Sequence, residues 1–345
     1  MTTTRRSATA ALLFALVAAA CSGGGDAGTK QPAAGAAGAT GKTITIAVVP
    51  KGTTHEFWNA IHAGAVKAER ELNANGVKVS ITWKGPLRED DREQQVQVVE
   101  GFLSQGVSGL VLAPLDEKAL VRPVEEAKRA GIPTVVIDSG LASTEIVSFV
   151  ATDNVKGGEL AADRMGALLG GKGKVLLLRY QEGSASTTER EVGFLNRLKE
   201  KFPGITLISS DQYAGPTRDT GKRASENLLN RYANDIQGVF CVNESSTHGM
   251  LLALQDIGKA GKISFIGFDA SQTFIDAIEA GQMHGLVVQN PMNMGYLGVL
   301  RMVDHLQGKP VDKRIDTGVW MITKENLSEP ATAELLHPPV ERYLN

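Results

Sequence analysis

Short apolar runs rich in Val and Ile recur along the chain from residue 43 onward, and stretches of mixed polarity separate them. Continuous apolar runs of this length are typical of strands that are buried on both faces of a sheet. The pattern predicts strands at residues 43–49, 77–83, 109–113, 133–138, 147–150, 174–179, 205–209, 238–242, 263–268 and 285–289.

The stretch between the first two runs has helical periodicity. Its apolar stripe consists of Ile61, Ala65, Ala68 and Leu72, spaced as on one face of a helix, and Asn75-Gly76 predicts where the helix ends. Strands that alternate with such helices indicate an α/β fold with parallel sheets. The body of the chain is about twice the length of an ordinary domain, which favours two domains, each with its own sheet and core.

In open parallel sheets, ligands bind beyond the carboxyl ends of the strands. The polar and aromatic residues that follow the predicted strands are His55, Phe57, Trp58, Asp138, Arg190, Asn243, Glu244, Asp269 and Gln289. Carboxylates, amides and a guanidinium suit a small ligand with many hydroxyls. The two rings would cover the C–H faces of a sugar, although Phe57 and Trp58 could also extend the core stripe that begins at Ile61. Arg190 is expected in the first turn of a helix.

The first residues have the layout of an export signal. Arg5 and Arg6 precede an apolar run at residues 8–20, which is too short to span a bilayer permanently. Residues 22–42 are mainly Gly, Ala, Thr, Gln and Pro and predict a tether. Removal of residues 1–20 changes the formal net charge from −2 to −4. The remaining basic residues are scattered, so we expect no nucleic-acid partner.

Other chemistry finds little support in the sequence. Cys241 lies in an apolar run and is expected to be a buried, unreactive thiol. The six histidines have no tight ligand spacing, so neither a metal nor a cofactor is predicted. The charged run REDDRE (residues 88–93) is expected to be a solvated helix start.

Seven segments carry a family resemblance over residues 43–323. They are HEFW, VVIDS, ATDNVKGGELAAD, STTEREVGF, VFCVNE, IGFDAS and VVQNPMNMGYLGV. In this order and spacing the chain resembles the periplasmic sugar-binding proteins of ABC importers, in particular the ribose-binding type, whose fold is shared by the ligand domains of the lactose-repressor family. Cys21 followed by SGGG also resembles a lipobox, with Ala18 where that motif usually has Leu.

The resemblance implies the type I periplasmic binding protein fold: two Rossmann-like lobes with parallel sheets, joined by a three-strand hinge. It also implies the limits of the parts. They are a signal peptide at 1–20, a lipidated Cys and flexible tether at 21–42, an N-terminal lobe at 43–152 plus 290–317, a C-terminal lobe at 153–289 plus 318–332, and a tail at 333–345, expected on the surface.

The sugar contacts of that family fall on His55, Phe57, Trp58, Asp138, Arg190, Asn243, Asp269 and Gln289. The family often has Asn at the position of His55 and Arg at that of Ser139. Pro216 stands where ribose binders carry an aromatic residue, and nearby Tyr213 is a candidate replacement. The resemblance therefore implies a sugar or related polyol that is not read in the same way as ribose.

The implied function is that of a monomeric solute-binding protein outside the cytoplasm, held to a bacterial membrane by its lipid alone, which delivers sugar to an ABC permease. Two alternatives stay open. A sensor would present its liganded form to a receptor kinase or chemoreceptor. A glycoside hydrolase would use Asp138 and Asp269 as its carboxylate pair, although nothing in the sequence raises the pKa of either, so we expect no enzyme.

The anchor is directly testable. The change Cys21→Ser removes the sulfur that would carry the lipid, so it should move the protein from the membrane fraction to the soluble fraction without changing ligand affinity. Fractionation followed by immunoblotting measures the membrane association, and calorimetry measures the ligand affinity. Unchanged membrane association would contradict the lipobox interpretation.

Overall fold

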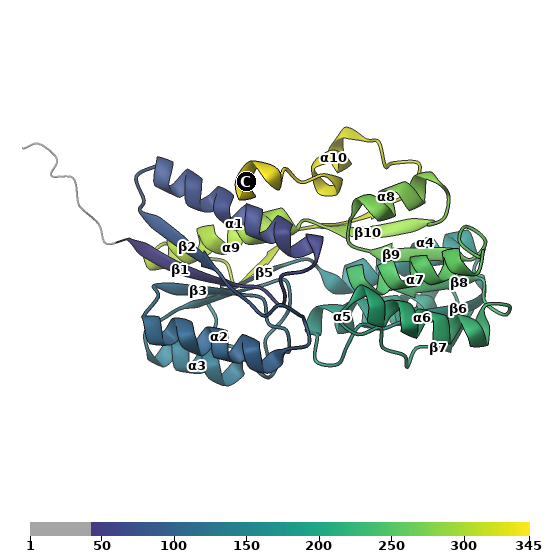
Figure 1. Cartoon of the computed structure of the whole chain (residues 1–345), viewed down its shortest axis with the longest axis horizontal. Helices are drawn as coiled ribbons and strands as arrows, with labels where there is room; N and C mark the ends of the chain where they lie inside the picture. The colour runs from purple at the N-terminus through teal and green to yellow at the C-terminus, as the bar shows by residue number, and fades with distance from the viewer. Residues whose placement is uncertain (1–42) are drawn as a thin grey trace, which may run out of the picture. The chain divides into compact units, whose positions relative to one another are not determined.

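A computed structural model describes residues 43–345, in which strands and helices alternate (Figure 1). The strands are β1 Ile44–Val49, β2 Val79–Trp83, β3 Gly109–Leu112, β4 Thr134–Ile137, β5 Ser148–Ala151, β6 Lys172–Leu178, β7 Gly204–Ser209, β8 Gly238–Cys241, β9 Ser264–Phe268, β10 Gly285–Gln289, β11 Arg314–Asp316 and β12 Val319–Ile322. The export signal, Cys21 and the tether lie outside the described residues.

The helices follow the strands almost regularly. They are α1 Glu56–Ala74, α2 Arg92–Gln105, α3 Val121–Arg129, α4 Asn154–Leu168, α5 Ala185–Lys201, α6 Arg218–Tyr232, α7 Glu244–Asp256, α8 Gln272–Glu279, α9 Pro291–Leu306, α10 Pro330–Leu336 and α11 Glu341–Leu344.

The strands form two six-stranded sheets with the same kind of order. Sheet A has the order β11-β5-β4-β3-β1-β2, and sheet B has the order β12-β10-β9-β8-β6-β7. All neighbours are parallel except β12, which is antiparallel to β10. The predicted α/β fold with two parallel sheets is confirmed. Each sheet winds outward in both directions from its first strand, so each has a switch point at its carboxyl edge.

All ten predicted strands exist, with ends that differ by up to two residues. The prediction missed β11 and β12, which have the sequences RID and VWMI. Both are short edge strands, and neither is buried along its whole length. The long apolar run that identifies a strand buried on both faces is therefore absent from them.

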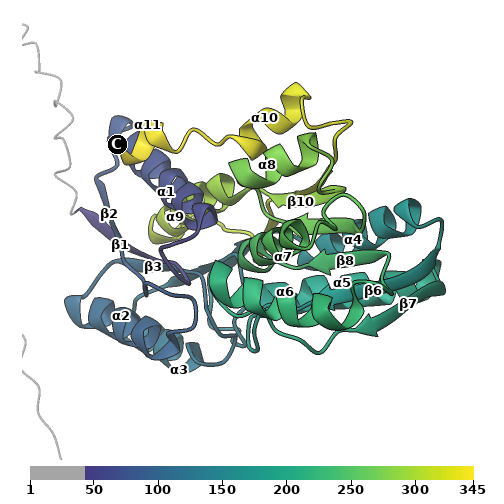
Figure 2. The same ribbon diagram turned by 45° about the vertical axis from the view of Figure 1, so that its right-hand side comes forward.

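Each sheet is covered on both faces, and alternate residues of one strand enter different cores. In β1, Ile46 and Val48 pack with α1 and α9, whereas Ala47 and Val49 pack with α2 and α3. The views in Figures 1 and 2 agree that these helix pairs lie on opposite faces of sheet A. Sheet B is covered by α4 and α5 on one face and by α6, α7 and α8 on the other.

Helix α1 packs closely against α9. The predicted stripe is confirmed at Ile61, Ala65 and Ala68, which are fully buried. Two glycines allow the close approach. A Cβ added at Gly64 would collide with the carbonyl oxygen of Met292, and one added at Gly295 would collide with the carbonyl oxygen of Ile61. The packing fixes the position of α1, whose first turn carries the predicted aromatic pair.

The last residues contact both halves of the fold. Leu335 and Leu336 of α10 belong to a core of sheet B. In α11, the backbone oxygens of Arg342 and Tyr343 each accept a hydrogen bond from Arg70 of α1 at 2.9 Å. Figure 2 shows α11 beside α1 and α10 beside α8. The C-terminal segment therefore runs from the sheet B core to a helix of sheet A.

The close approach of α1 and α9 is testable with Gly295→Ala. Because the new Cβ would collide with rigid backbone, the free energy of unfolding should fall by about 1–3 kcal/mol. Urea denaturation measures it. The control is Gly101→Ala in α2, where a Cβ meets no described atom within 4 Å and the change should stabilise the helix by about 0.5–1 kcal/mol. Equal effects of the two changes would contradict the packing argument.

Candidate functional site

Residues that follow strands of both sheets surround a cavity of about 30 Å³. Its lining comprises Lys51, His55, Phe57, Trp58, Glu89, Asp138, Tyr180, Thr187, Asn243, Glu244, Asp269 and Gln289. Seven of the eight residues predicted to bind ligand are on this list, and Arg190 is not. We call this space the inner cavity. All of its lining residues are polar or aromatic, and polar groups that converge with aromatic rings on one buried space indicate a ligand site.

Two aspartates occupy equivalent positions in the two sheets. Asp138 follows β4 and Asp269 follows β9, and both have a left-handed backbone, with φ values of 61° and 70°. They are the only non-glycine residues with positive φ among residues 43–345. A non-glycine residue in this conformation is strained, and such strain concentrates at functional sites. The two carboxylates are nearly inaccessible to solvent.

Asp269 is held by its own half of the fold. Its Oδ2 accepts a hydrogen bond from the backbone N–H of Glu244 at 2.9 Å, and its Oδ1 accepts one from Gln289 Nε2 at 2.7 Å. Asn243 caps α7, since its side chain accepts from the N–H of Ser246. Three predicted residues are thus fixed in place at the carboxyl ends of β8, β9 and β10.

Asp138 is paired with a cation that the sequence analysis missed. Lys51, two residues after β1, lies 3.0 Å from the Asp138 carboxylate and also donates to Ser186 Oγ at 3.1 Å. Ser139 accepts a hydrogen bond from the backbone N–H of Ser186. Since Lys51 lies in the loop that follows the first strand, the strand-end rule could have found it. It occupies the cavity wall together with the carboxylate that it neutralises.

Glu89 connects the aromatic side chains that line the inner cavity. Its carboxylate accepts hydrogen bonds from Trp58 Nε1 at 2.7 Å and from Tyr180 O–H at 2.6 Å, and it forms an ion pair with His55 Nδ1 at 2.6 Å. Phe57 meets the Trp58 ring edge to face, with centroids 5.0 Å apart. The bonds join a helix of sheet A to the end of β6 in sheet B.

The prediction that the REDDRE run is solvated was wrong for Glu89, which is 5% exposed. It was right for Asp91, which is exposed and caps α2 by accepting from the N–H of Gln94. A buried acidic residue is difficult to recognise within a run of charged residues, because its neighbours in the run are all exposed. The signal that remained was its position in the loop that follows β2.

Arg190 lies in the second turn of α5, not in the first turn as predicted. Its Nε donates to Asn154 and its Nη1 to the carbonyl oxygen of Val242, while its guanidinium lies 3.8 Å from the centre of the Phe268 ring. Burial lowers its pKa, and the charges of Asp269 and Asp138 oppose that effect. Arg190 therefore lies behind the cavity wall, and its contact with a ligand stays a prediction.

The candidate replacement Tyr213 does not line the inner cavity. Its ring lies 4.6 Å from the guanidinium of Arg179. The aromatic residue that reaches the cavity from sheet B is Tyr180, which comes two residues after β6 and is 1% exposed. A search by strict spacing misses it because Tyr180 belongs to a different loop.

The buried charges have strongly shifted pKa values. Burial alone would lower the pKa of His55, yet the carboxylate of Glu89 outweighs this and raises it to about 9. Burial alone would raise the pKa of Glu89, yet His55 and Lys51 lower it to about 2. Both groups are consequently charged at neutral pH. In contrast, burial raises the pKa of Asp269 and of Glu244.

Two further classes of site find no support in the part of the chain that the structure describes. Among residues 43–345, no group of three or more His, Cys, Asp or Glu side chains is placed to hold a metal ion. Within the same residues, no helix combines the length and the apolar character that crossing a membrane requires. Cys241 is buried as predicted, and burial raises the pKa of its thiol.

Comparison with known proteins gives one consistent result. Residues 46–310 match the model of the periplasmic binding protein domain. The ribose import binding protein of Bacillus subtilis (strain 168) is 33% identical over 82% of this chain and 88% of its own. A carbohydrate transporter solute-binding protein of Agrobacterium radiobacter, solved with D-arabinose, has a TM-score of 0.80 and 32% identity, over 85% and 99% of the two chains. One from Agrobacterium vitis, solved with D-fucose, has a TM-score of 0.80 and 34% identity, over 85% and 100%.

The ion pair between His55 and Glu89 predicts a pH dependence of stability. Because the pKa of folded His55 is raised from 6.5 to about 9, its contribution is complete below pH 6.5 and is lost as the pH rises toward 9. Because the pKa of folded Glu89 is lowered from 4.5 to about 2, its contribution is complete above pH 4.5 and is lost as the pH falls toward 2.

Glu89→Gln should therefore cost about 3–5 kcal/mol between pH 4.5 and 6.5, where both groups of the parent are charged. The gap between parent and variant should narrow as the pH rises from 6.5 to 9. Urea denaturation across this range measures it, with exposed Glu200→Gln as the control. A gap that stays constant from pH 6.5 to 9 would contradict the assigned ion pair.

Proposed function

This chain belongs to the periplasmic binding protein family, and we propose that it captures a sugar or related polyol outside the cytoplasm and delivers it to the permease of an ABC transporter. One observation carries the proposal. Two strained, buried aspartates from equivalent positions of two sheets line the same cavity, together with the Phe57–Trp58 pair. Carboxylates that face an aromatic wall suit a ligand with hydroxyls on its edge and C–H groups on its face.

The roles within the site follow from the hydrogen bonds already made. Gln289 Oε1 is buried and has no partner among the described residues, so it is available to accept from a ligand hydroxyl. His55 uses Nδ1 for Glu89, which leaves Nε2 for the ligand. Asp138 and Asp269 accept from hydroxyls, and Asn243 is placed beside them in the lining. Arg190 does not line the cavity, but its positive charge favours the ionised form of Asp269.

The sugar would not be read in the manner expected of a ribose binder. The family position that often holds Arg is Ser139 here, and Ser139 is engaged with Ser186. Lys51 supplies a cation beside Asp138 instead. An ammonium has a different donor geometry from a planar guanidinium, so a different arrangement of hydroxyls should be preferred.

We take the two lobes to have the limits 43–152 plus 290–317 and 153–289 plus 318–332. The assignment of β1–β5 and β11 to sheet A, and of β6–β10 and β12 to sheet B, supports these limits. Contacts such as those of Tyr180 with Glu89 and of Lys51 with Ser186 then cross the cleft. A ligand that also bridges the cleft would favour the closed arrangement by its higher affinity for it.

The remaining parts of the proposal concern the cell. A signal peptide at 1–20 would export the chain, and a lipid on Cys21 would hold it to a bacterial membrane through the tether at 21–42. The protein would act as a monomer and without a cofactor. It would bind its sugar without turnover, although the raised pKa of Asp269 is the feature that a hydrolase would need, so recovery of intact sugar belongs in the test.

Sugar binding can be tested by a thermal-shift screen over pentoses, hexoses, inositols and sugar alcohols. Binding to the native state should raise the melting temperature, since ligand at 100 times Kd stabilises it by about 2.7 kcal/mol. Long incubation should return the sugar chemically intact. A screen without a shift would contradict sugar binding, and detectable turnover would support the hydrolase alternative.

The participation of both sheets can be tested with Asp138→Asn and Asp269→Asn. Asn tolerates the left-handed backbone, so each variant should fold, as circular dichroism would check. Calorimetry with the sugar found by the screen should give a Kd that is roughly tenfold to a hundredfold higher. The control is the exposed Asp235→Asn. Parent affinity in a folded variant would remove that sheet from the site.

A further inference from the structure

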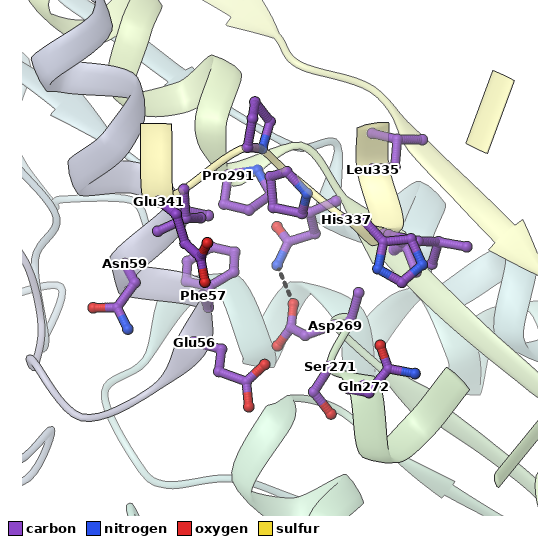
Figure 3. A pocket seen from close by; sticks show the side chains of 18 of the residues that line it. Glu56, Phe57, Asn59, Asp269, Ser271, Gln272, Pro291, Leu335, His337 and Glu341 are labelled. Carbon is purple, nitrogen blue, oxygen red and sulfur yellow. Dashed lines mark hydrogen bonds between the residues drawn. The ribbon is translucent and has the colours of Figure 1, made fainter. Parts of the chain in front are cut away.

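A second and much larger space lies next to the inner cavity. This outer cavity has a volume of about 610 Å³ and is lined by the first turn of α1, the start of α8 and the C-terminal segment from Leu335 to Arg342 (Figure 3). Phe57, Asp269 and Gln289 line both cavities. The inner and outer cavities are therefore neighbours with a common wall, and the outer one has the volume of pockets that enclose small-molecule ligands, roughly 300–1,000 Å³.

Two buried polar atoms at the outer cavity have no partner among the described residues. They are Ser271 Oγ and Gln289 Oε1, and their residues are 3% and 2% exposed. Ser271 holds the N-cap position of α8, yet its hydroxyl makes no capping bond. A buried polar group without a partner is energetically unfavourable. Both atoms are therefore placed to bind a polar group that enters this space.

The rest of the lining is of mixed polarity. The polar residues are Glu56, Asn59, Gln272, His337, Glu341 and Arg342, and the apolar ones include Pro291, Leu335, Leu336, Pro338 and Pro339. Figure 3 shows Glu56 and Ser271 on one side of the space, with Pro291 and Leu335 on the other. A sugar ring is likewise of mixed polarity, with hydroxyls at its edge and C–H groups on its faces.

The C-terminal segment, residues 335–342, lines the outer cavity and is held at both ends. Leu335 and Leu336 anchor it in a core of sheet B, and Arg70 of α1 holds the backbone of Arg342 and Tyr343. A segment that is fixed in this way keeps its apolar residues over the space.

We propose that the outer cavity is a second carbohydrate subsite and that the ligand is a disaccharide. One ring would occupy the site between Asp138, Asp269 and the aromatic pair, and the other would lie under the C-terminal segment, bound by Ser271. The inference rests on the proposed function and extends it from sugars in general to two-ring carbohydrates. The glycosidic linkage would lie beside Phe57, Asp269 and Gln289, the residues that line both cavities.

The test is calorimetry of the full chain with matched pairs of sugars: glucose with maltose, cellobiose and gentiobiose, galactose with melibiose, and xylose with xylobiose. At least one disaccharide should bind at least about tenfold more tightly than its monosaccharide, the gain from one or two added hydrogen bonds. Ser271→Ala should reduce this gain by roughly threefold to tenfold and leave monosaccharide affinity unchanged.

A blocking variant locates the second ring. Asn59→Trp places a bulky side chain in the outer cavity and should abolish the gain, whereas Ala74→Trp, on the exposed last residue of the same helix, should leave it intact. Circular dichroism and melting temperature establish that each variant is folded. A gain that survives Asn59→Trp would overturn the placement of the second ring under the C-terminal segment.

The outcomes separate this inference from the proposed function. If monosaccharides bind and no disaccharide of the set binds better, the second subsite is overturned and sugar binding stands. If no carbohydrate of either kind binds, both are overturned. Disaccharide binding without monosaccharide binding supports both, provided that Asn59→Trp abolishes it.

Discussion

The common direction of the strands is the constraint on which the site depends. Eleven of the twelve described strands are parallel to a neighbouring strand, so the loops that carry polar residues leave each sheet at its carboxyl edge. Because both sheets have the same order, the same positions recur in each half. Asp138 after β4 and Asp269 after β9 are the clearest case, since both have the same strained backbone. The fold thus places two matching carboxylates around one cavity.

Buried charge determines how this cavity is built. The carboxylate of Glu89 would be costly to bury alone, and it is satisfied by donors from two sides: His55 and Trp58 at the start of α1, and Tyr180 after β6. The same bonds hold the aromatic wall in position and connect the two halves. Lys51 likewise forms an ion pair with the buried carboxylate of Asp138. Each side chain proposed to meet the ligand is therefore oriented before the ligand arrives.

The sequence predicted the parts of the fold and site that follow from local pattern. Ten strands, the stripe of α1 and seven lining residues of the inner cavity were accessible because apolar runs and strand ends are visible in the chain. Lys51 could have been found by the same rule, since it comes two residues after β1. Glu89 and Tyr180 could not, because their importance comes from contacts with residues distant in the sequence. β11 and β12 were missed because short edge strands lack a continuous apolar run. The outer cavity depends on where the C-terminal segment packs, which no periodicity reveals.

The most direct test of the central claim is a crystal structure of the protein with the sugar that stabilises it best. The account predicts electron density for a sugar ring with its C–H face on the Phe57–Trp58 pair and its hydroxyls within hydrogen-bond distance of both Asp138 and Asp269. Density for the sugar at any other place, or contact with only one of the two aspartates, would contradict a site that is built from both sheets.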